Sequence, residues 1–169
     1  MDPAHRLGEL EDSELAGIPE EFVTSPGWSV KLINPAVAAN QPASPANDSR
    51  VQNMADDLLP TAVHMANFYH LPFGESLNMV YIDSRSGIEE NAAVLLRFLT
   101  EISGSHQAWI PLAASHSLLL NALQQILPQI QQLDLSSNPL LYIGDYANFT
   151  SIRHIGDVCD MPVFCQATF

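Results

Sequence analysis

The sequence is short of positive charge. Lys31 is its only lysine, and six basic against nineteen acidic side chains give the 169 residues a formal net charge of −13. A surface of this sign repels phosphate backbones and anionic lipid head groups, so we expect no direct nucleic-acid partner and no membrane partner. A P-loop is excluded because no lysine follows a glycine-rich turn. A basic protein surface or a metal ion, in contrast, would be attracted to the chain.

Cysteine and long apolar runs are also scarce. Cys159 and Cys165 lack the paired Cys/His spacing of a zinc site and are predicted to be free thiols in a reducing compartment. No apolar run approaches the roughly 20 residues that cross a bilayer. Residues 1–10 lack the apolar core of a secretory signal. These absences together predict a cytoplasmic protein.

Residues 1–49 are expected to form a flexible acidic leader and a linker. Seven of the first 21 residues are acidic, and 35–49 consists mainly of Ala, Asn, Pro and Ser. Within this region 28–33 can form a short strand. Residues 50–169 are then expected to be an α/β domain, beginning with a helix that Pro60 breaks or kinks.

Short apolar runs alternate with amphipathic stretches from residue 76 onward. Strands are expected at 77–82, 108–113, 140–143 and 161–167, and helices at 88–102, 118–127 and 148–155. Such alternation is typical of right-handed crossovers in a parallel sheet. We therefore predict an α/β fold of three layers, with a mainly parallel sheet of about four to five strands and flanking helices.

The loops that leave the carboxyl ends of parallel strands gather at one edge, where ligands usually bind. This edge is expected to collect the metal or phosphoacceptor candidates Asp83, Asp145 and Thr168, and the rim side chains Ser84, Arg85, Ser115 and His116. Asp83 and Asp145 at adjacent strand ends can hold Mg²⁺, or they can be caps of turns and helices. A serine hydrolase would instead use Ser84 or Ser86 with His116 and Asp145, although no Gly-x-Ser-x-Gly elbow is present.

From Met79 to Phe169 the order of elements resembles a CheY-like receiver domain, most closely the degenerate receivers that precede some transcription activators. The resemblance rests on 80–85, on the helix through 95–99 and on the strand 140–145. It implies that Asp83 binds metal, that Asp145 accepts phosphate and that Thr168 is the hydroxyl residue after a later strand. The chain departs from the family in having one acid, Asp83, where the family has an acidic pair.

The absence of a motif that dictates one chemistry, together with the acidic bias, predicts a non-catalytic regulatory or scaffolding module. Such a module binds another protein, one with a basic surface being favoured by charge, and needs no cofactor. Two alternatives stay open: a receiver-type switch that accepts phosphate with Mg²⁺, and a small Ser/His/Asp hydrolase. A homodimer formed through the exposed sheet edge also stays open.

Overall fold

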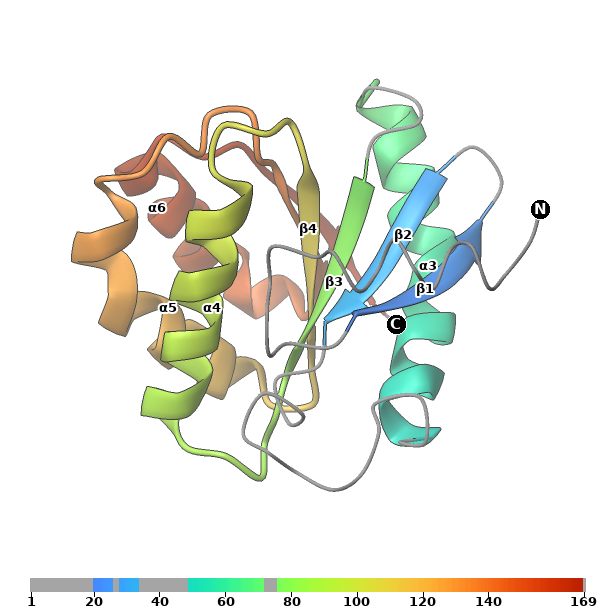
Figure 1. The fold of residues 1–169 in the computed structure, drawn as a ribbon, viewed down its shortest axis with the longest axis horizontal. Helices are drawn as coiled ribbons and strands as arrows, with labels where there is room; N and C mark the ends of the chain where they lie inside the picture. Colours follow the sequence, from blue (N-terminus) through green and yellow to red (C-terminus); the bar gives the residue numbers. More distant parts are fainter. Residues whose placement is uncertain (1–19, 26–27, 34–48, 72–75, 169) are drawn as a thin grey trace.

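A six-stranded sheet forms the centre of the protein (Figure 1). The structure is a computed structural model that describes residues 20–25, 28–33, 49–71 and 76–168. The strands are β1 (Glu20–Ser25), β2 (Trp28–Ile33), β3 (Ser76–Ile82), β4 (Ala108–Ala113), β5 (Leu140–Gly144) and β6 (Val163–Ala167). The helices are α3 (Ser49–Phe68), α4 (Ile88–Ile102), α5 (His116–Ile130) and α6 (Phe149–Cys159), with a 3₁₀ turn η2 (Tyr146–Asn148) before α6.

The strands lie in the sheet in the order of the sequence. β1 pairs antiparallel with β2, and every pairing from β2 to β6 is parallel. The predicted α/β fold with a mainly parallel sheet is therefore confirmed. The strand at 28–33, expected in the linker region, is an inner strand between β1 and β3 and so belongs to the sheet. None of the described helices combines the length and apolar character needed to cross a membrane.

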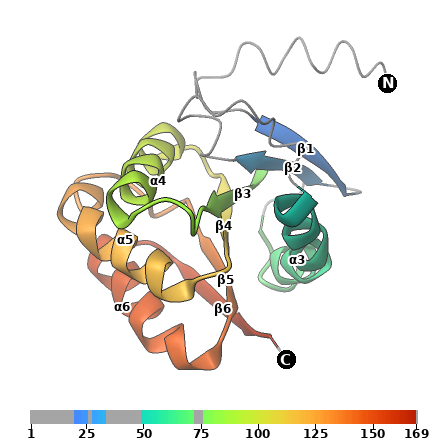
Figure 2. The ribbon, with the colours of Figure 1, turned by 90° about the horizontal axis from the view of Figure 1, so that it is seen from below.

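The helices are distributed unequally over the two faces of the sheet. α4, α5 and α6 cover one face, and α3 is the one described helix on the other (Figures 1 and 2). Connections that step in one direction along a parallel sheet keep their helices on one face if they share a hand. The β2–α3–β3 connection therefore has the opposite hand to the three that follow, whereas such connections are right-handed in about 98% of cases. α3 contacts β1, β4 and β5 on this face.

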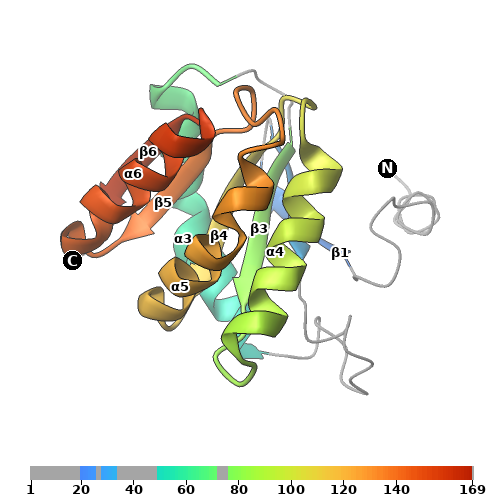
Figure 3. The same ribbon diagram turned by 90° about the vertical axis from the view of Figure 1, so that its left-hand side faces the viewer.

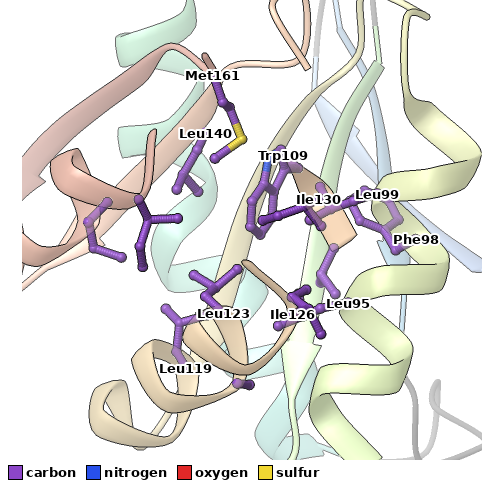
Figure 4. Packing of buried hydrophobic residues seen from close by; sticks show 14 of the residues in the cluster. Leu95, Phe98, Leu99, Trp109, Leu119, Leu123, Ile126, Ile130, Leu140 and Met161 are labelled. Carbon is purple, nitrogen blue, oxygen red and sulfur yellow. The ribbon is translucent and has the colours of Figure 1, made fainter. Parts of the chain in front are cut away.

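One apolar core lies on each side of the sheet. The larger core joins α4, α5 and α6 around Trp109, which is fully buried and meets Phe98 edge to face at 6.1 Å (Figure 4). The smaller core joins α3 to the other side of the strands and includes Met65 and Met79. Complete burial of each large apolar side chain stabilises the fold by about 1.5–3 kcal/mol. A core on each face explains why β3, β4 and β5 are buried almost throughout and do not alternate between apolar and polar residues.

The element boundaries follow the apolar periodicity closely where the periodicity is strong. α4 and β4 span the residues predicted for them. Of the two outcomes expected at Pro60, a break or a kink, the break does not occur: α3 continues through that residue. α6 extends four residues beyond the predicted end at Ile155, to Cys159, and its amphipathic face is buried against the sheet.

Candidate functional site

The carboxyl ends of the parallel strands form one edge of the sheet, and Figure 2 views the protein from this edge. Asp83 follows β3, Ser115 and His116 begin the α5 region after β4, and Asp145 follows β5. β4 lies between β3 and β5, so the expectation that Asp83 and Asp145 leave adjacent strands is wrong. Thr168 follows β6 and is exposed, with its backbone N–H donating to the Gly144 carbonyl at 3.0 Å.

Asp83 is engaged in the turn that follows β3. Its side chain is buried, and the carboxylate accepts three hydrogen bonds from Arg85: from the backbone N at 2.9 Å, from Nε at 3.0 Å and from Nη2 at 3.3 Å. Burial alone would raise the pKa of Asp83, but the hydrogen bonds and charge of Arg85 outweigh it and hold that pKa below its usual value. A cation at this carboxylate would have to compete with the Arg85 guanidinium.

The backbone of the same turn is fixed by a buried amide. Asp83 donates its N–H to Asn91 Oδ1 at 2.9 Å, and Asn91 Nδ2 donates to the carbonyls of Asp83 at 3.0 Å and Gly87 at 2.9 Å. Ser84 and Arg85 are exposed at the tip of this turn. Across the described parts of the chain, no three His, Cys, Asp or Glu side chains come together in a group that could hold a metal ion. The geometry therefore supports a structural role for Asp83.

A chain of hydrogen bonds links α5 to β5 at the same edge. His116 Nδ1 lies 2.7 Å from Tyr142 Oη, and Asn148 Nδ2 donates to that Oη at 3.0 Å. Because the phenolic oxygen already accepts from Asn148, its own proton points most favourably to Nδ1, and the neutral His116 then carries its proton on Nε2. Burial lowers the pKa of His116, against the charge of Asp145, which favours this neutral form.

Gly144 makes room for this pair. A Cβ at this position would lie 2.6 Å from Tyr142 Oη and 2.8 Å from His116 Cε1. The Tyr142 ring is fully buried and meets His116 edge to face, with centroids 5.5 Å apart. Burial is the main cause that raises the pKa of Tyr142, so the phenol stays protonated and can donate to His116.

Neither of the predicted nucleophiles Ser84 and Ser86, nor the rim residue Ser115, takes part in the hydrogen bonds of His116 within the described residues. Ser115 Oγ caps α5 by accepting from Leu118 N at 3.3 Å and lies 3.2 Å from Ser117 Oγ. Asp145 is exposed and accepts from Ala147 N at 2.9 Å, which caps η2. The hydrogen bond at His116 Nδ1 goes to Tyr142 rather than to a carboxylate. The Ser/His/Asp geometry that a hydrolase requires is thus not assembled from these side chains.

The parallel strands begin at the opposite edge of the sheet, which is the upper edge in Figure 1. A hollow opens at this edge. Its volume is about 220 Å³. Residues from six separate segments line it: Trp28, Leu71, Ser76, His106, Ala108, Ser136, Ser137, Pro139, Pro162 and Phe164. No sequence motif predicts such a site, because its walls come from the beginnings of five strands and the end of a helix.

Beside this hollow lies an aromatic cluster formed by Phe68, Tyr69 and Phe164. Tyr69 stacks on Phe164 with centroids 4.1 Å apart, and Phe68 meets Tyr69 edge to face at 5.0 Å. Phe68 is 65% exposed. The cluster joins the end of α3 to the last strand of the sheet, so the hollow, the cluster and β6 form one continuous surface.

Comparison of this chain with protein-family models, with curated proteins and with solved structures finds no match. Its function must therefore be argued from the surface itself.

Proposed function

We propose that this protein is a non-catalytic binding module that accepts an extended segment of another protein along the open edge of β6. β6 is the last of the described strands in the sheet, and among these strands it pairs with β5. Its five residues, VFCQA, carry no charge in a chain whose net charge is −13. Natural edge strands are commonly protected by charges, proline or a covering element, and an unprotected edge is a template for strand addition.

The direction of the backbone groups in β6 follows from its hydrogen bonds to β5. Leu140 N donates to the Pro162 carbonyl at 2.9 Å, and Thr168 N donates to the Gly144 carbonyl at 3.0 Å. Since successive residues of a strand point their N–H and C=O to alternate sides, the even-numbered residues of β6 face β5. Val163, Cys165 and Ala167 therefore present their N–H and C=O groups to the open edge.

The side chains around this edge favour an apolar partner segment with basic flanks. All five residues of β6 are half-buried, and the Phe68, Tyr69 and Phe164 cluster stands next to its first half. A partner strand would cover these rings while its backbone pairs with β6. The net charge of −13 on the whole chain would attract lysine or arginine on either side of the bound segment.

The single observation that carries the proposal is the edge position of the uncharged strand β6 in the described part of the sheet, and a Cys165→Pro variant tests it. This change removes an outward N–H without removing a bond to β5, so the fold should tolerate it. Cys165→Ala is the matched control, since it alters the side chain and keeps the N–H. Peptides would first be selected from a random display library on the wild-type protein.

Loss of one or two backbone hydrogen bonds, each about 1 kcal/mol, should weaken the selected peptides by about tenfold in Cys165→Pro and hardly at all in Cys165→Ala. Peptide binding should also slow amide exchange at Val163, Cys165 and Ala167. Equal affinity for the two variants, without protection of those amides, would contradict strand addition at β6.

A further inference from the structure

We infer that the hollow at the amino-terminal edge of the sheet is a binding site for one small, uncharged aromatic group. Side chains with rings form much of its wall: the aromatic residues Trp28 and Phe164 and the saturated rings of Pro139 and Pro162. An apolar cavity of about 150 Å³ is large enough to bind benzene. The hollow, at about 220 Å³, therefore has room for a ring system of roughly the size of indole.

The polar groups of the lining set the charge of the ligand. Among the described residues that line the hollow there is no Lys, Arg, Asp or Glu, and His106 is the one titratable side chain of this set. A cation would lose its hydration without gaining a carboxylate, and an anion would enter against the net charge of −13. Ser76 and Ser137 supply hydroxyls that can pair with one N–H or O–H of a neutral ring.

The wall that carries His106 and Ala108 is held in place by two buried amides. Asn138 Nδ2 donates to the Gln107 carbonyl at 3.0 Å, and Asn78 Nδ2 donates to Gln107 Oε1 at 3.1 Å and to the Ala108 carbonyl at 3.0 Å. His106 itself has a left-handed backbone, with φ of 62°. A non-glycine residue in this region costs free energy and persists where its surroundings fix it, as at binding sites. The hollow is thus preformed, which lowers the entropic cost of binding.

The aromatic group can come from a free small molecule or from the side chain of a bound protein segment. Pro162 and Phe164 belong both to the wall and to the beginning of β6, so a segment lying along β6 would bring a side chain to the mouth of the hollow. The chemistry is the same in both cases. The site does not depend on strand addition at β6, and the two proposals can fail separately.

Free indole is the probe for the site, and the two tryptophans of the chain make its binding visible in ¹⁵N-labelled protein. The indole N–H resonance of Trp28, in the wall, should shift in a saturable manner, whereas that of Trp109, fully buried in the opposite core, should stay in place. Ser137→Phe fills the hollow from its mouth and should weaken binding at least tenfold. Ser84→Phe, at the far edge of the sheet, is the matched control and should bind as the wild type does.

Two further measurements separate the sources of the ring. Cys165→Pro should leave the indole titration unchanged, even if it abolishes peptide binding. If Ser137→Phe also weakens the selected peptides, the occupant is a side chain of the bound segment; if it weakens indole alone, the occupant is a free molecule. An unshifted Trp28 resonance up to the solubility limit of indole, or an equal shift in Ser137→Phe, would overturn the inference.

Discussion

Replacement of Gly144 by alanine tests the contact between His116 and Tyr142 most directly. The added Cβ would stand 2.6 Å from Tyr142 Oη and 2.8 Å from His116 Cε1, far inside normal contact. Neither neighbour can withdraw easily, because the Tyr142 ring is fully buried and its Oη is held by Asn148. Overpacking of this kind typically costs about 1–3 kcal/mol, and loss of the His116 hydrogen bond adds about 1 kcal/mol.

We therefore expect Gly144→Ala to lower the free energy of unfolding in urea by about 2–4 kcal/mol. Displacement of the ring should also expose His116 and raise its pKa toward the ordinary value, which NMR titration of its ring protons can follow. Gly87→Ala is the control, because its Cβ would meet only the carboxylate end of Glu90, a flexible and exposed group.

The Gly87→Ala change should cost less than about 1 kcal/mol. A Gly144→Ala protein as stable as Gly87→Ala, with the titration of His116 unchanged, would refute the close packing of His116 and Tyr142 over Gly144.

Two more predictions concern other buried polar groups. Asn138→Ala should lower the free energy of unfolding in urea by about 3 kcal/mol, because Asn138 is fully buried and also accepts a hydrogen bond from Gly104 N at 3.0 Å. The control Asn67→Ala, at an exposed position, should change that free energy by less than about 0.5 kcal/mol. Equal effects of the two changes would contradict a structural role for Asn138. His116 has a lowered pKa in the folded state, so its contribution to stability is complete above the usual value of 6.5 and is lost as the pH falls through the folded value. A His116→Gln variant should accordingly lose less stability than the wild type between about pH 7.5 and about pH 5.5, and parallel losses in the two proteins would count against a buried neutral imidazole.

The apolar periodicity of a single segment is enough to predict the type and bounds of the helix or strand that the segment forms. α4 and β4 were predictable to the residue because their apolar spacing is regular and the ends carry Gly87 and Gly104. The placement of Asp83 and His116 at one edge also follows from alternation of strands and helices. The order of the strands does not follow from it, since an inner and an edge position give β4 the same apolar pattern.

Contacts between segments that are far apart in the sequence could not be predicted from the sequence. His116 was predicted as a rim residue, but its partner Tyr142 looked like an ordinary buried residue of β5, and only the placement of α5 beside β5 brings them within 2.7 Å. The sequence did not predict the hollow, because serines, prolines and a histidine at the beginnings of strands are also typical of turns without a binding role. The aromatic pairing of Tyr69 with Phe164 joins residues 95 positions apart, and no spacing rule connects them.

The sequential strand order gives the β6 surface and the hollow a common origin. Three successive connections place α4, α5 and α6 on one face, and the single connection of opposite hand leaves α3 to cover the other face alone (Figure 3). Parallel sheets are ordinarily covered on both faces. α3 contacts β1, β4 and β5, and Tyr69, which follows the helix, stacks on Phe164 of β6. Among the described helices α3 alone lies on that face, so the connection of unusual hand also accounts for the apolar surface on which we propose that a partner segment binds.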